Sequence, residues 1–186
     1  MSISRAAIVL AVCGATVTGL LGFRSATAQH AEEKKAETIE KAVAILIPTK
    51  DSKVQGRVTF SHEGGKNTVH AVLSGLTPGK HGFHIHQYGV WSEDGMASGG
   101  HYNPTGHPHA GLEVKNRHVG DLGNITADDK GNAELTINDA GFMFHGPNSI
   151  IGRGVVVHAK ADDLKSQPAG DAGGRLAVGV IGVAKP

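Results

Sequence analysis

Short apolar runs separated by glycine-containing turns constrain the fold of this chain more than any other feature. Glycine supplies 27 of the 186 residues, about twice the usual share of ~7%. The apolar residues gather in short stretches and not at the spacing of long amphipathic helices, which predicts an all-β, turn-rich protein. The predicted strands cover residues 41–47, 54–60, 67–73, 81–86, 122–128, 132–137, 154–160 and 175–183.

Eight strands of this length predict closure into a sandwich or flattened barrel. The turn sequences TKDS, HEGGK and LTPGK separate the first four strands, and such short connections indicate antiparallel pairing. The sequence DDKGN at residues 128–132 predicts a hairpin turn. Two connections are much longer, at residues 90–121 and 159–174, and loops of that length in a compact domain are usually functional or disordered.

The first 28 residues have the pattern of a secretory signal peptide. Arg5 precedes an uncharged run over residues 6–23, and Ala26 and Ala28 form a small-x-small cleavage site. The alternative is an uncleaved membrane anchor, because the uncharged run is near the minimum length for a span. Residues 29–40 are polar and charged, which indicates a flexible N-terminal segment ahead of the domain at residues 41–186.

Charge and cysteine content exclude several classes of protein. Loss of residues 1–28 would remove Arg5 and Arg24 and leave a chain close to neutral, with no basic stripe for nucleic acid. Cys13 is the single cysteine and lies within the predicted signal peptide. An exported domain without cysteine has no disulfides, so it needs a good core, bound metal, or both.

The stretch HGFHIHQYG at residues 81–89 places His84 and His86 two positions apart. Side chains alternate between the faces of a strand, so these two imidazoles share one face while Phe83 and Ile85 point to the other. One interpretation is a polar outer face that happens to contain histidines; the other is a metal site. The remaining candidate ligands fall in or near the long loops: His101, His107, His109, His118, Asp121, His158 and Asp162.

In combination, these residues resemble the copper/zinc superoxide dismutase family. The resemblance rests on GFHIH at residues 82–86, His101, His109, HVGD at residues 118–121, His158 and GDAGGRLAVGVI from Gly170, and it spans about residues 41–183. It implies an eight-stranded Greek-key β-barrel with two long functional loops. It also implies an enzyme that dismutates superoxide to oxygen and hydrogen peroxide in antioxidant defence.

The resemblance implies a role for each candidate residue. His84, His86, His101 and His158 would bind copper; His101, His109, His118 and Asp121 would bind zinc, with His101 shared. These donor types suit the two metals. By spacing alone His107 competes with His109, and only the family alignment selects His109. Asp162 would join a copper histidine to a zinc histidine, and His81 would be a structural residue below the copper site.

The resemblance also implies catalytic roles for Arg175 and His101. Arg175 would attract and orient superoxide, and His101 would carry a proton to the departing peroxide. The chain departs from the family at the two disulfide cysteines, which Gly95 and Val178 replace. In the family this bond ties the metal-binding loop to the strand that carries the arginine, so the sequence leaves open what positions Arg175.

Two further readings of the sequence compete with the enzyme. One is a non-enzymatic copper/zinc-binding protein on the same fold, and the other is a structural β-domain, which predicts decayed ligands. Each ligand position of the family is filled here, which favours the enzyme. The sequence is compatible with a homodimer but marks no interface, and it predicts no nucleic-acid partner and no membrane contact after signal cleavage.

The signal peptide makes a direct prediction. Cleavage after Ala28 should give an exported protein, periplasmic or extracellular, whose chain begins at Gln29. Mass spectrometry of the exported protein measures this directly, and retention of Met1 or Arg5 would contradict it.

Overall fold

The computed structural model describes residues 38–138 and 140–185. The predicted signal peptide and nearly all of the N-terminal segment therefore lie outside the described residues, and cleavage after Ala28 stays a prediction. Among the residues that are described, the search for a helix of sufficient length and hydropathy to cross a bilayer finds none.

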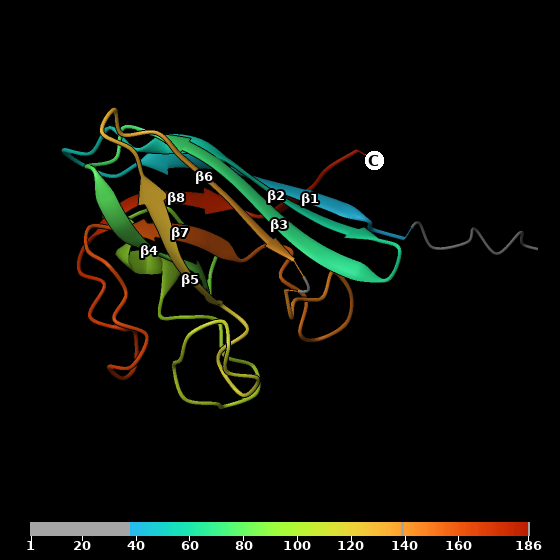
Figure 1. The fold of residues 1–186 in the computed structure, drawn as a ribbon. Helices are drawn as coiled ribbons and strands as arrows, with labels where there is room; N and C mark the ends of the chain where they lie inside the picture. Colours follow the sequence, from blue (N-terminus) through green and yellow to red (C-terminus); the bar gives the residue numbers. More distant parts are fainter. Residues whose placement is uncertain (1–37, 139, 186) are drawn as a thin grey trace, which may run out of the picture. The chain divides into compact units, whose positions relative to one another are not determined.

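The described chain is built from β-strands and one short 3-10 turn (Figure 1). All strand pairs are antiparallel. The elements are β1 Lys41–Pro48, β2 Gln55–Glu63, β3 Lys66–Ser74, β4 Gly79–His86, the 3-10 turn η1 Met96–Ser98, β5 Asp121–Ala127, β6 Ala133–Asn138, β7 Gly154–His158, β8 Arg175–Val180 and β9 Gly182–Val183.

The sheet closes into a barrel through β1. Its strands follow the order β2-β3-β6-β5-β4-β7-β8-β1-β9, and β1 also pairs with β2. The N-terminal part of β1 pairs with β2 from Lys41 to Leu46, while Ile47 and Pro48 pair with β8. The predicted all-β, eight-stranded Greek-key barrel is therefore confirmed, with β9 as a short additional strand.

Two details differ from the sequence prediction. The last predicted strand breaks at Ile181, whose backbone turns to exchange hydrogen bonds with Gly152 and Arg153 and whose side chain is buried. In addition, β4 does not continue the β1–β2–β3 meander. It crosses the barrel and pairs with β5 on one side and β7 on the other, which is where the candidate ligands lie.

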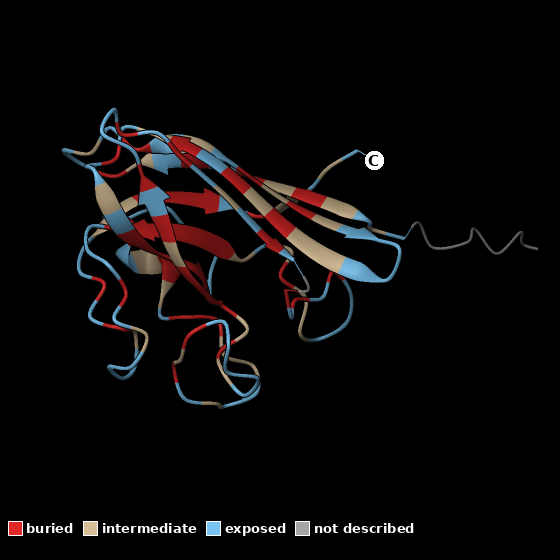
Figure 2. Ribbon diagram, viewed as in Figure 1, coloured by how far each residue is buried: buried red, intermediate tan, exposed pale blue. Residues whose placement is uncertain are grey.

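Period-2 alternation of side chains builds the core. Along β1 and β3, buried apolar residues alternate with more exposed ones, as the banded ribbons of Figure 2 show. Phe60 from β2 is fully buried and packs edge-on against Phe142, with ring centroids 5.5 Å apart. In contrast, β4 and β7 are buried on both faces over most of their length. Both long loops hydrogen-bond to the backbone of β4, at Gly82 and at Ile85.

Truncation of the aromatic pair tests the core. Phe60→Ala should destabilise the domain by about 3–5 kcal/mol, since it removes a fully buried ring. Val72→Ala on neighbouring β3 is the control; Val72 is 44% exposed, and its loss should cost less than about 1 kcal/mol. Urea unfolding of metal-loaded protein measures both, and equal effects would place Phe60 outside the core.

Candidate metal centre

Strand β4 supplies two histidines from one face of the sheet. Phe83 and Ile85 enter the hydrophobic core on the opposite face. His84 and His86 are nevertheless buried as well, because the loops lie over them. Of the two interpretations of the His-x-His pattern, the polar outer face is therefore excluded.

Backbone pairing brings the first long loop onto β4. His101 forms an isolated antiparallel bridge with His86. The Tyr102 amide donates to the Ile85 carbonyl at 2.8 Å, and the Gln87 amide donates to the Gly100 carbonyl at 2.9 Å. A short extra strand contact thus places the His101 ring against the His84 ring, with centroids 3.9 Å apart.

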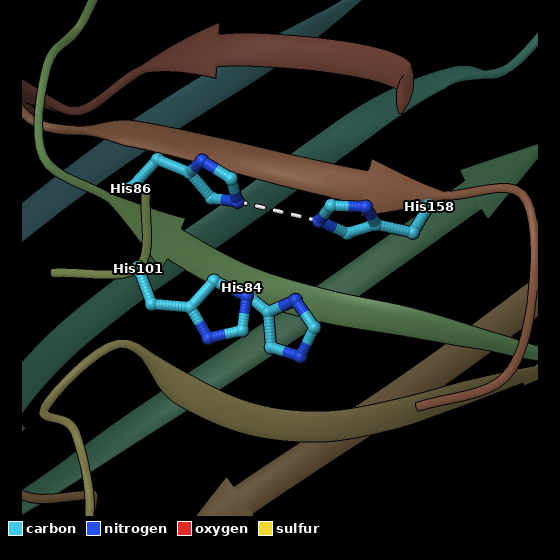
Figure 3. A group of neighbouring side chains, drawn as sticks. All are labelled: His84, His86, His101 and His158. Carbon is cyan, nitrogen blue, oxygen red and sulfur yellow. Dashed lines mark hydrogen bonds between the residues drawn. The ribbon is translucent and has the colours of Figure 1, made fainter. Parts of the chain in front are cut away.

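The candidate ligands form two groups that share one member. His158 comes from the end of β7, opposite Arg175 of β8. Figure 3 shows the rings of the first group gathered over β4 and β7, with His101 reaching in from the loop. Within each group one ligand atom per residue lies within 4.8 Å of every other: His84, His86, His101 and His158 in the first, and His101, His109, His118 and Asp121 in the second.

The free ring nitrogens fit two metal ions. His84 Nδ1, His101 Nε2 and His118 Nδ1 are buried and have no hydrogen-bond partner, although His118 Nδ1 lies 3.1 Å from Asp121 Oδ1 in a poor geometry. Buried polar atoms are rarely left unpaired, so atoms of this kind point to missing partners. Three imidazole nitrogens and a carboxylate suit tetrahedral zinc, and a set of imidazoles suits copper.

Several of the other ring nitrogens form hydrogen bonds within the protein. His84 Nε2 bonds Asp162 Oδ2 at 2.8 Å and His109 Nε2 bonds Asp162 Oδ1 at 2.9 Å, so one carboxylate links the two groups. The Gly99 carbonyl holds His86 Nδ1 at 2.8 Å. Such contacts fix the tautomer and orientation of a ligating histidine.

A family model described as copper/zinc superoxide dismutase matches residues 54–181. The chain belongs to this family. A curated relative, superoxide dismutase [Cu-Zn] 2 from Brassica juncea, is 47% identical over 150 residues, which cover 77% of this chain and 97% of the relative. A solved structure titled as the clock protein EA4 superposes with a TM-score of 0.72 and 39% identity, covering 80% of this chain and 98% of that one.

Membership of the copper/zinc superoxide dismutase family implies copper and zinc as the metals, and burial prepares the histidines to bind them. Burial and the neighbouring His101 and His158 rings hold the pKa of His84 well below its ordinary value. The pKa of His86 is also held well below its ordinary value, first by burial and then by the His158 and His101 rings. Burial lowers the pKa of His158 to about 4. These rings are neutral at physiological pH, as metal binding requires.

Around Asp121, hydrogen bonds shift the pKa values in favour of the charged forms of Asp121 and His109. Burial alone would raise the pKa of Asp121, but hydrogen bonds with His101 and His109 outweigh it and lower that pKa. Burial likewise opposes protonation of His109, yet its hydrogen bonds with Asp121 and Asp162 raise its pKa. Asp121 therefore carries a full negative charge where a divalent cation would lie.

One glycine is required for the carboxylate bridge. Gly170 has φ +65°, and a Cβ at this position would lie 1.8 Å from Asp162 Oδ1 and 2.7 Å from His109 Nε2. Another residue here would therefore need a left-handed backbone and would displace the bridging carboxylate. Gly170 begins the GDAGG sequence on which the family resemblance rests.

Other histidines lie apart from the two groups. Asn103 exchanges hydrogen bonds with the backbone of His107, and the neighbouring His109 is the one that lies among the ligands. Both ring nitrogens of His81 are within 2.9 Å of backbone carbonyl oxygens, those of His158 and Thr77. His62 and His145 are exposed and His70 is partly so, as predicted, whereas His30 lies outside the described residues.

Sequence reasoning missed the residues that hold the second loop. The Gln167 side chain bonds both the amide and the carbonyl of His109, each at 2.8 Å. The Asn124 side chain pairs with the backbone of Asp162 at 2.7 and 2.9 Å. Neither contact has a sequence signal, because each joins residues far apart in the chain through a side-chain amide.

The lowered histidine pKa values predict acid sensitivity of the metal-free protein. In the unfolded chain His84, His86 and His158 would titrate near the ordinary value of 6.5. The unfolded state therefore binds protons first as the pH falls below 6.5, and stability should decline between pH 6.5 and about 4. The pKa of His118 is also lowered, chiefly by burial, so the raised pKa of His109 opposes the effect of four other histidines.

Differential scanning calorimetry of chelator-treated protein at several pH values measures this effect. His158→Gln, which removes one of the titrating groups, is the matched variant and should show a shallower decline. A thermal midpoint that rises from pH 7 to pH 5 would contradict the assignment.

Proposed function

We propose that this chain dismutates superoxide to oxygen and hydrogen peroxide with copper held by His84, His86, His101 and His158, and zinc held by His101, His109, His118 and Asp121. The main support for this proposal is that His101 belongs to both ligand groups. Its Nδ1 lies 2.9 Å from Asp121 Oδ1 in the zinc group, while its buried Nε2 is unpartnered in the copper group.

Copper, when bound, supplies the one-electron oxidation and reduction that dismutation requires, because zinc has no redox chemistry. Within the protein, His101 has a ring nitrogen facing each group, so Nε2 can hold a proton and release it to the peroxide product. Asp162 keeps the outward nitrogens of His84 and His109 protonated, so their other nitrogens face the metals.

Arg175 is proposed to attract and orient the substrate anion. Its backbone lies opposite His158 in the β7–β8 register. Its charge contributes to the lowered pKa of His86 and of His158, after the larger effects of burial and of neighbouring histidine rings. Burial lowers the pKa of the guanidinium, but arginine remains charged at physiological pH. A cation beside the copper group favours superoxide at the site.

The proposal includes export and self-association. The sequence pattern of residues 1–28 supports an exported enzyme, periplasmic or extracellular, that would work in antioxidant defence and have no membrane contact once the signal is cleaved. The near-neutral charge without a basic stripe argues against a nucleic-acid partner. Exposed apolar side chains on adjacent strands β1, β8 and β9 support a homodimer, which sedimentation analysis would test: Ile45, Val180 and Val183.

Two substitutions separate the proposed ligand roles. His101→Ala should change the copper absorption spectrum and weaken zinc retention together, since His101 faces both groups. His118→Ala should remove mainly zinc and leave the copper spectrum closer to wild type. His70→Ala is the control, because His70 is partly exposed and lies outside both ligand groups.

Metal content and superoxide consumption should be measured on the same purified samples. Both metals with superoxide consumption support the enzyme, and metal without consumption would indicate the non-enzymatic metal-binding alternative. An unchanged copper spectrum in His101→Ala would refute the shared ligand.

A further inference from the structure

The two positions that carry the disulfide in the family still face each other here. A Cβ on Gly95 would lie 2.6 Å from Val178 Cγ2, so the loop and β8 meet without a covalent bond. A disulfide constrains a loop strongly. Some other contact must therefore fix the loop against Arg175, which lies three residues before Val178.

The turn η1 surrounds the Arg175 guanidinium with acceptors. Arg175 Nη1 donates to the Ser98 hydroxyl at 2.9 Å and to the Gly95 carbonyl, and Nη2 donates to the Gly99 carbonyl. Gly95, at the start of the turn, has φ +79°, a left-handed conformation that glycine adopts at little cost. The Gly95 carbonyl and the Ser98 hydroxyl accept from the two N–H groups of Nη1. The Gly99 carbonyl accepts from one of the two N–H groups of Nη2.

Among these acceptors Ser98 supplies a side chain and the other two supply backbone carbonyls. Ser98 is fully buried, with 0% exposure, so its hydroxyl is out of contact with bulk water in the folded protein. A buried N–H of a charged group left without an acceptor is costly, so the guanidinium would move to find another partner.

The backbone of Arg175 is held separately, from the end of β1. Thr49 Oγ1 donates to the Arg175 carbonyl at 2.7 Å, and the Thr49 amide donates to the Leu176 carbonyl at 2.9 Å. Because the main chain is fixed in this way, the direction of the long Arg175 side chain depends on contacts at its far end. Ser98 is one of these contacts.

We propose that Ser98 is a positioning residue that aims the Arg175 guanidinium at the anion site and takes over part of the task of the missing disulfide. The proposal rests on the proposed function of Arg175. The three hydrogen bonds leave two of the five guanidinium N–H groups, Nε–H and one on Nη2, without an acceptor in the described part of the chain. These are the groups available to an anion.

Azide binding to the copper- and zinc-loaded protein tests the proposal, because azide is a small anion that alters the visible absorption of copper(II). Ser98→Ala should weaken azide binding about threefold to tenfold, as expected for loss of the net contribution of one typical hydrogen bond. Ser98→Thr, which keeps the hydroxyl, should restore most of the affinity. In an Arg175→Gln background, Ser98→Ala should cause no further loss.

Ser149→Ala is the matched control, because it removes a serine hydroxyl that also forms a hydrogen bond, but one donated to the Phe144 carbonyl and not accepted from Arg175. It should leave azide binding unchanged. Unaltered azide affinity in Ser98→Ala would overturn the proposal. An equal loss with and without Arg175 would also overturn it, since Ser98 would then act through the general fold.

A second measurement is independent of copper and of activity. Phenylglyoxal modifies accessible arginine side chains, and mass spectrometry of the zinc-loaded protein follows its reaction at Arg175. Ser98→Ala should accelerate this modification severalfold and leave that of exposed Arg57 unchanged. An unchanged rate at Arg175 would refute the hydroxyl contact, whereas an accelerated rate in a protein inactive toward superoxide would refute only the proposed function.

Discussion

The pairing of the first long loop with β4 is the constraint on which the site depends. The bridge between His86 and His101 joins a barrel strand to a loop that has little strand structure of its own. Through this bridge a residue 15 positions beyond His86 reaches the rings of β4. The barrel thereby provides a rigid support, and the loop provides the histidine that belongs to both ligand groups.

Burial of so many imidazoles is tolerated because nearly every polar atom has a defined partner. Asp121 and Asp162 are buried carboxylates, and each accepts hydrogen bonds from two histidines. The nitrogens without partners are those that face a ligand group. The site is therefore preorganised, and metal binding needs to displace protons and not to rebuild the polypeptide around itself.

Local patterns in the sequence predicted the strands and the His84–His86 pair, because alternation is a property of a single strand. They did not separate His107 from His109, since that choice depends on the turn closed by Asn103. They also did not predict the break at Ile181, which follows from hydrogen bonds to a different segment at Arg153. The contacts of Gln167, Ser98 and Thr49 were missed for the same reason: each forms only after distant elements meet.

Closure of the sheet through β1 has a consequence for how the domain meets other protein molecules. An open sheet presents two rows of unpaired backbone groups, which can recruit strands from other molecules and start aggregation. Here the pairing of β1 with β2, together with β8 and β9 along its other side, joins the two ends of the sheet. The domain thus protects its backbone from edge-to-edge pairing by the topology of the sheet itself.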